Sequence, residues 1–209
     1  MEVGVLLDPR LDHAAQPALV LVPVAGTVGD EAGQNGSRLR GAHGTAGELG
    51  HRPVSIDHLD DLRDLDRQGK RKPVPDLPAL DPQAPCPRCK EPGHLEAYIT
   101  TPALVDRVIP EAAADPAPDR YIRHRRELMK RLGKPAGRGD PAARRAVEDA
   151  ARLLARTAIP LIHFVDPSHV VVSGALRRAG DHLLEPLKEE LEEHGGFKDG
   201  VPTIVASAG

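Results

Sequence analysis

Two short blocks of the sequence hold most of the side chains that could do chemistry. The first is the block Gly41–His51, which reads GAHGTAGELGH. Its many glycines favour tight turns over packing, and they leave Glu48 and His51 as functional candidates. The second is Cys86–Tyr98, CPRCKEPGHLEAY, with two thiols, an imidazole and the carboxylate of Glu96. Thiolates and imidazoles bind zinc, and ionised carboxylates accept hydrogen bonds from hydroxyl groups, so the blocks together could supply a zinc site and a polyol site.

The spacing of the cysteines favours a structural zinc site. Cys86 and Cys89 are separated by two residues, which lets two thiolates share one tetrahedral ion, and His94 follows as a third ligand. A zinc knuckle of the retroviral type would need a cysteine at position 99, which is Ile99, so we expect His51 to be the fourth ligand. Lengthening a closed loop from ~10 to ~34 residues costs only about 1 kcal/mol. A structural Zn²⁺ contributes on the order of 10 kcal/mol, which outweighs that cost.

Two alternatives remain for the cysteines. The stretch Cys86–Cys89 also has the spacing of a dithiol redox motif, although no predicted strand precedes it and no helix clearly begins at it. The other alternative is a pair of free thiols in a surface loop. Two cysteines this close together cannot form a disulfide framework, which fits the reducing cytoplasm.

Alternating strand and helix patterns predict an α/β fold around these blocks. An apolar, β-branched strand is expected over 17–25, and Asn35-Gly36 is typical of a hairpin turn. Residues 54–85 lack a regular period and indicate an inserted loop, with one helical turn near 60–66. The later elements are predicted from apolar spacing, capping residues and glycine stops. Four helices are expected: from Thr101-Pro102 to about 112, over 119–132, from Asp140-Pro141 to Val165, and through Leu183–Leu191. Two strands are expected, at Val170–Val172 and Val201–Ala206.

Composition excludes some classes of partner. The chain has 209 residues, a net charge of −3 and no clustered basic excess, which argues against a nucleic-acid-binding segment. The longest apolar run, 17–25, is too short to span a bilayer, and the N-terminus lacks the basic start of a signal peptide. We therefore expect a cytoplasmic protein that does not interact with membranes.

The two blocks resemble signature motifs of the ROK family, which groups bacterial sugar kinases with sugar-responsive repressors and unassigned open reading frames. Family members carry G-A-H-G-x-x-G-E-x-G-H, which Gly41–His51 matches almost completely, and then C-x-C-G-x-x-G-C-L-E-A-Y. Aligned on Leu95–Tyr98, the second motif keeps Cys89, has Pro87 at its first cysteine and has His94 at its third. Residues 165–174 resemble the family's "DP" turn and the glycine-rich loop on the adenosine side.

The resemblance implies a fold and a site. The fold would be the C-terminal half of an actin-like, ribonuclease-H-like sugar-kinase fold with a zinc-binding loop. Glu48, His51 and Glu96 would bind a hexose or amino sugar, and structural zinc would hold their loops together. The likeness divides the chain into an N-terminal remnant, 1–16, and a sugar-recognition domain, 17–206, whose segments 54–85 and about 113–139 match poorly. A homodimer is also expected.

Two parts of a family kinase are not identifiable. The D-x-G-G-T phosphate loop does not occur, and no carboxylate stands in the motif of the family's catalytic aspartate. The second phosphate loop falls on Gly26, Thr27 and Gly29, where a tight strand-to-hairpin turn is the alternative that we favour. The chain also carries no helix-turn-helix pattern, so it resembles the C-terminal half of a family protein, cut off at both ends.

These observations leave three functional hypotheses. The first is the effector domain of a sugar-responsive transcriptional regulator, without catalytic activity of its own and with no catalytic residues to assign. The second is part of an ATP-dependent, glucokinase-like hexose kinase. The third is a structural or dimerisation module in which zinc stabilises an interface and no ligand binds.

Overall fold

The computed structural model describes all residues except 1, 7–17, 23–47, 118, 134–138 and 207–209. A four-stranded sheet runs in the order β1-β2-β3-β4, formed by Glu2–Leu6, Ala18–Val22, His169–Val172 and Thr203–Ala206. β1 pairs antiparallel with β2, while β2, β3 and β4 are parallel. Because β2 and β3 are neighbours, every helix from α1 to α6 lies within the single connection between them.

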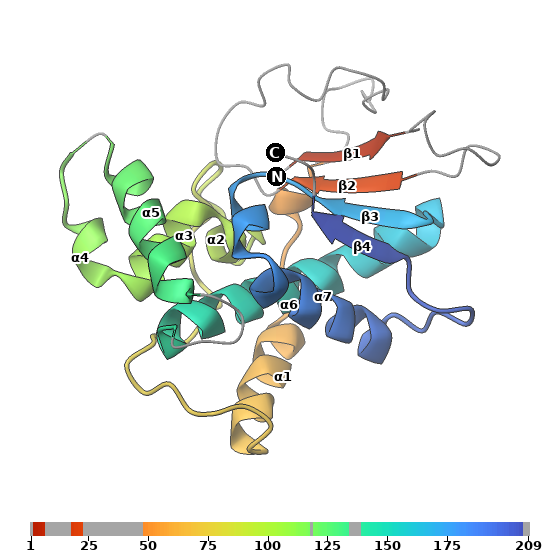
Figure 1. Ribbon diagram of the computed structural model, residues 1–209, viewed down its shortest axis with the longest axis horizontal. Coiled ribbons are helices and arrows are strands. Elements are labelled where there is room, and N and C mark those ends of the chain that lie inside the picture. The colour runs from red at the N-terminus through yellow and green to blue at the C-terminus, as the bar shows by residue number, and fades with distance from the viewer. Residues whose placement is uncertain (1, 7–17, 23–47, 118, 134–138, 207–209) are drawn as a thin grey trace.

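The helices gather beside and below the sheet (Figure 1). Helix α6 (Pro141–Val165) packs against α7 (Asp181–His194); α6 buries leucine and alanine side chains in the common core, and α7 buries leucines. Helices α3 (Thr101–Val108), α4 (Pro110–Ala113) and α5 (Arg120–Leu132) form a second group at the other end of α6. The remaining helical elements are η2 (Leu49–His51), α1 (Ile56–Arg67), α2 (Glu96–Ile99) and η3 (Ala175–Ala179).

The helical predictions for the C-terminal part are confirmed. The Asp140 side chain accepts a hydrogen bond from the Ala142 N–H and begins α6, and Asp166 ends it in the left-handed conformation. The apolar stripe of α6 is buried, except that Leu161 is only partly so. Strands β3 and β4 and helices α5 and α7 lie within a few residues of their predicted positions.

Three predictions need correction. Residues 56–67 form the three-turn helix α1, where we expected a loop with one helical turn. The helix predicted to run from Thr101 to 112 is split at Ile109, because a residue before proline avoids the helical conformation and Pro110 starts a new turn. The N-terminal capping residue of this first helix is Thr100, one residue before the predicted start at Thr101. Strand β1 lies within the stretch that we expect to be an N-terminal remnant, and the division of the chain at 16/17 stays a prediction. The Asn35-Gly36 hairpin lies outside the described residues.

Ion pairs fix the 56–85 segment to α6, and further ion pairs fix α6 to α7. Arg71, whose side chain is 8% exposed, bonds Asp66 at 3.1 Å and Asp149 of α6 at 2.8 Å. At the other end of this interface, Glu190 of α7 lies between the guanidinium groups of Arg152 and Arg156 and is 3% exposed. Burying so many charges is tolerable only because each has a partner of opposite sign. The segment is thus part of the domain's packed structure.

Replacing Ser55 by alanine tests the start of α1. The Ser55 Oγ accepts a hydrogen bond from the Asp57 N–H at 3.2 Å and satisfies one of the free donors of the first turn. We expect Ser55→Ala to lower the free energy of unfolding by about 1 kcal/mol, measured by urea denaturation. Ser55→Asp keeps an acceptor at this position and should remain within a few tenths of wild type, ~0.3 kcal/mol. Equal losses in both variants would show that the cap is not responsible.

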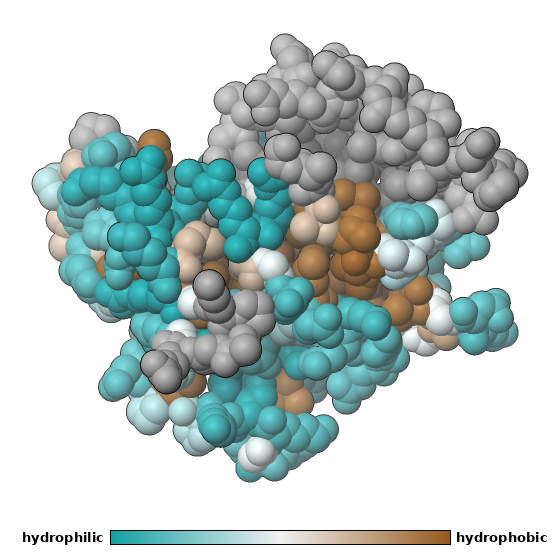
Figure 2. Space-filling model, viewed as in Figure 1, coloured by the Kyte–Doolittle hydropathy of each residue, from teal (hydrophilic) through white to brown (hydrophobic). Residues whose placement is uncertain are grey.

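The surface differs between the two ends of the molecule. Figure 2 shows apolar residues gathered where β3 and β4 lie in this view, and mostly hydrophilic residues over α5. Val205 of β4 is 37% exposed, in keeping with that apolar area. No helix among the described residues is both long and apolar enough to cross a membrane.

Candidate metal centre and its neighbouring carboxylates

A short backbone pairing brings the two sequence blocks together. The Val54 N–H donates to the Gly93 carbonyl at 2.8 Å, and the Leu95 N–H donates to the Arg52 carbonyl at 3.0 Å. Pro53 and His94 face each other in an antiparallel bridge between these two bonds. The pairing places His94 beside the turn η2, whose last residue is His51.

The loop that carries the cysteines is closed by its own hydrogen bonds. The Cys86 N–H donates to the Glu91 carbonyl at 2.9 Å, and the Lys90 N–H donates to the Cys86 carbonyl at 3.0 Å. Lys90 takes a left-handed conformation to complete the turn, with φ 68°. Gly93 is also left-handed, and a Cβ there would lie 3.1 Å from the Pro82 carbonyl oxygen. A glycine is therefore required at the point where the loop leads into His94.

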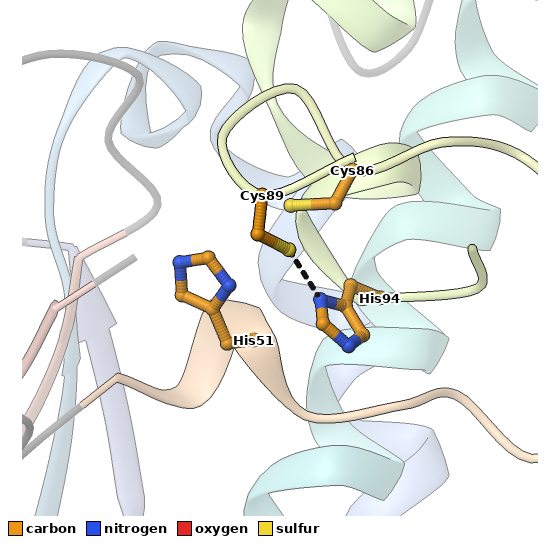
Figure 3. A group of neighbouring side chains, drawn as sticks. All are labelled: His51, Cys86, Cys89 and His94. Carbon is orange, nitrogen blue, oxygen red and sulfur yellow. Dashed lines mark hydrogen bonds between the residues drawn. The ribbon is translucent and has the colours of Figure 1, made fainter. Parts of the chain in front are cut away.

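Four potential ligands converge at this junction, as the sequence predicted (Figure 3). One ligand atom from each of His51, Cys86, Cys89 and His94 lies within 4.8 Å of all the others. The Cys89 Sγ lies 3.2 Å from His94 Nδ1, and the His51 and His94 rings are nearly perpendicular, with centroids 5.6 Å apart. Tetrahedral zinc with bonds of about 2.0–2.3 Å needs its ligand atoms ~3.5 Å apart. Small side-chain adjustments reach that spacing, so the residues fit a zinc ion.

The two cysteines differ in their surroundings. Cys86 is completely buried, whereas Cys89 is exposed, so they are not simply two thiols of a surface loop. Burial raises the pKa of the Cys86 thiol, which keeps it protonated when no metal is bound. Because zinc binds the thiolate, metal binding must release this proton.

Glu96, one of the two predicted sugar-binding carboxylates, begins α2 and is 2% exposed. Its Oε2 accepts from the Cys86 thiol at 3.6 Å. Burial opposes ionisation of Glu96, yet its pKa lies below the usual value, because nearby positive charge, that of Arg88 included, favours the carboxylate. Glu96 is thus an ionised acceptor directly beside the metal ligands.

Glu48, the other predicted carboxylate, directly precedes η2. Its Oε2 is 3.5 Å from His51 Nε2 and 3.0 Å from a guanidinium nitrogen of Arg88. The two carboxylates therefore come from the two segments that the four potential ligands join. Sequence reasoning identified both glutamates but missed Arg88, whose position between the two cysteines was the available signal.

Another contact secures the segment that leads into the cysteine loop to the core. The Tyr98 hydroxyl of α2 donates to the Asp81 carbonyl at 2.9 Å. Burial, together with the charge of Asp81, raises the pKa of Tyr98 to about 12, so the hydroxyl remains a donor at all physiological pH values. Of the other candidates, the phosphate-loop residues Gly26, Thr27 and Gly29 lie outside the described residues.

Comparison with known proteins agrees with this geometry. The fold resembles the crystal structure of a ROK family transcriptional regulator, a homologue of the E. coli MLC protein, with a TM-score of 0.53 and 19% identity over 82% of this chain and 37% of that one. The chain therefore has a partial, actin-like α/β fold. Residues 12–207 match the sequence profile of the ROK family, so the chain belongs to the ROK family.

Two further relatives are named as sugar kinases. A glucokinase of Halalkalibacterium halodurans is 26% identical over 201 residues, which cover 91% of this chain and 52% of that protein. The glucokinase of Streptomyces griseus, solved with glucose and AMPPNP, is 23% identical, with a TM-score of 0.47, over 82% of this chain and 49% of that one. The chain thus spans about half the length of the curated relative that it matches.

Proposed function

We propose that this chain is a sugar-recognition domain whose pocket is held together by a structural zinc ion. The observation that carries the proposal is the placement of Glu48 and Glu96 on the two segments that His51, Cys86, Cys89 and His94 join. Ionised carboxylates are strong acceptors for sugar hydroxyls, and two of them beside one metal cluster could bind two parts of one ring. Family membership supports the ligand class, since the related Streptomyces griseus glucokinase was solved with glucose.

Zinc would act on structure and not as a Lewis acid. When bound, it would link His51 near η2 to the loop of Cys86, Cys89 and His94, and so fix the separation of the two carboxylates. Its four ligands would come from the protein, which leaves no position for a substrate oxygen. Within the sugar site, Glu48 and Glu96 accept hydrogen bonds and His51 orients Glu48.

We further propose that the chain acts as the effector domain of a ROK-type regulator. The alternative is that it forms part of a hexose kinase, which the glucokinase name of its Halalkalibacterium halodurans relative favours. Phosphoryl transfer from ATP to glucose by this chain alone would establish the kinase and contradict the regulator. The coding sequence next to this chain's own would also separate them, since a winged helix-turn-helix belongs to a regulator and a D-x-G-G-T loop to a kinase.

Replacing Glu48 by glutamine tests the sugar site. Titration calorimetry of the zinc-loaded chain with a panel of hexoses and amino sugars should first identify a ligand. Glu48→Gln removes a charge-assisted hydrogen bond worth about 1.5–3 kcal/mol and should weaken that ligand roughly 10- to 100-fold. Glu91→Gln, at an exposed carboxylate of the loop that carries the cysteines, is the control and should bind like wild type. Zinc content should be unchanged in both variants, and heat from no sugar at all would contradict the proposal.

A further inference from the structure

We propose that Cys86 and Cys89 are a site of reversible oxidation, at which a hydroperoxide converts two zinc-binding thiolates into a disulfide and so removes the metal. The inference rests on the proposed function, because it takes zinc to hold the two segments of the sugar site together. It adds a modification site and a means of control. Its basis is that one pair of cysteines combines the ligand geometry of a zinc site with the spacing of a dithiol redox motif.

The two sulfurs are placed for a disulfide. They lie within 4.8 Å of each other, and Figure 3 shows them side by side. The loop turns back between them, since the Lys90 N–H donates to the Cys86 carbonyl. In a tight turn, Cα atoms three residues apart are less than about 7 Å apart, and a disulfide spans ~4.4–6.8 Å. Rotation of the Cys89 side chain can therefore bring the sulfurs to the bond length of ~2.05 Å.

The unequal exposure of the two cysteines assigns their roles. Cys89 is exposed, so a small oxidant can reach its sulfur from solvent. Cys86 is completely buried, but its sulfur lies close enough to attack an oxidised Cys89. Thiolates that are open to solvent and have a second cysteine beside them are the ones that oxidise reversibly. The chain contains only these two cysteines, so a single intramolecular disulfide is the expected product.

The oxidation takes two steps. The Cys89 thiolate attacks one oxygen of the hydroperoxide and gives up two electrons, so that a sulfur–oxygen bond forms, the oxygen–oxygen bond breaks, and the leaving oxygen takes a proton from water. The Cys86 thiolate then attacks the sulfur of the Cys89 sulfenic acid, so that the disulfide forms and hydroxide leaves and is protonated. In total, two thiolates, one hydroperoxide and two protons give one disulfide, one alcohol and one water; with hydrogen peroxide the alcohol is a second water.

Oxidation removes the metal because zinc binds thiolates, and a disulfide has none. His51 and His94 would then be the two ligands left of the four. The carboxylates proposed for the sugar are in contact with this cluster: Glu48 Oε2 lies 3.5 Å from His51 Nε2, and Glu96 Oε2 lies 3.6 Å from the Cys86 Sγ. Without the metal the two carboxylates are held less rigidly, so we expect oxidation to lower the affinity for sugar.

Treatment of the zinc-loaded full chain with hydrogen peroxide tests the proposal. A chromogenic chelator should report about one zinc released per chain. The mass of the chain should fall by two hydrogens as both thiols disappear, and dithiothreitol followed by Zn²⁺ should restore the thiols and the metal. A reagent that traps sulfenic acids, present from the start, should label Cys89. Zinc that stays bound, or a label on Cys86 instead, would overturn the inference.

Cys89→His separates disulfide formation from general damage by peroxide. An imidazole at this exposed position can still bind zinc, but Cys86 then has no second thiol with which to pair. We expect the variant to release zinc at least roughly tenfold more slowly than wild type at the same peroxide concentration. Equal rates in the two proteins would contradict disulfide formation as the cause. The mass and trapping measurements use the wild-type chain, so they decide the matter whatever the zinc affinity of the variant.

Sugar binding distinguishes this inference from the proposed function. A sugar that binds the reduced, zinc-loaded chain should bind the oxidised chain at least roughly tenfold more weakly, and reduction with Zn²⁺ should restore its affinity. If peroxide releases zinc and the affinity does not change, oxidation does not control the site and the inference is wrong. If a sugar binds and peroxide leaves the zinc in place, the inference fails and the proposed function stands. A zinc-loaded chain that binds no sugar contradicts the proposed function, while the release of zinc still decides whether the two cysteines are an oxidation site.

Discussion

Replacing Cys86 by serine is expected to remove zinc from the purified chain and to cause the largest loss of stability of any change proposed here. The wild-type chain should contain about one zinc per molecule, as expected for one tetrahedral site. Structural zinc contributes on the order of 10 kcal/mol in small peptides, and a serine hydroxyl is a poor substitute for a thiolate. Because Cys86 is completely buried, the variant also buries a serine hydroxyl without a metal to bind it, which lowers the stability further.

A chelator separates the metal's contribution from that of the side chain. Wild-type protein treated with a strong chelator should unfold at a temperature close to that of Cys86→Ser, and the chelator should leave the variant unchanged. Release of protons on adding Zn²⁺ back to the metal-free wild type should be detectable in a weakly buffered solution, because the Cys86 thiol is protonated without metal. A wild-type chain that is free of metal as purified, and unaffected by both reagents, would contradict the zinc site.

The second large effect is expected at Glu190 of α7, which is not a potential metal ligand. Glu190 is 3% exposed, and its carboxylate lies between Arg152, at 2.9 Å, and Arg156. Glu190→Ala would leave both arginines without their shared buried partner, and breaking a buried ion pair on one side costs about 3–5 kcal/mol. We expect a loss of this size in the free energy of unfolding, measured by urea denaturation.

Glu189 provides a closely matched control. Its carboxylate also bonds Arg152, at 2.7 Å, but the side chain is 58% exposed. Removing an exposed partner costs only about 0–1 kcal/mol because water replaces it. If Glu189→Ala and Glu190→Ala cost the same, burial would not be the reason for the effect of Glu190.

The sequence predicted best those elements whose signals are local. Helix α6 shows an apolar stripe over many turns and has a cap at Asp140, and both features act within a few residues of each other. Helix α1 was missed because its apolar face is narrow, with only Leu59 and Leu62 buried. Most of the other residues of α1 are charged, and the helix is held by pairs such as Asp60 with Arg63 and by its attachment to α6. That attachment depends on tertiary contacts, which no local pattern records.

In the candidate site, too, the parts with local sequence signals were predicted and the part that depends on tertiary contacts was not. The two cysteines and His94 lie close together in sequence, so their spacing alone indicated a shared metal. His51 was chosen by elimination, and the structure supports it through the pairing of 52–54 with 93–95. The contact of Arg88 with Glu48 could not be predicted, because it depends on how two distant loops approach each other and on one long side chain.

The long connection between β2 and β3 also has a consequence for how the protein is made. The ribosome synthesises β2 before α1 to α6, and the strand that pairs with its parallel edge follows only after them. All four potential metal ligands leave the ribosome in that interval, so the metal centre and the helices around it can become ordered while the sheet is still incomplete. Meanwhile the apolar strand Ala18–Val22 must wait with one open edge, and such strands are prone to aggregate. Zinc supply during synthesis should therefore affect the yield of soluble protein more than its final stability alone would suggest.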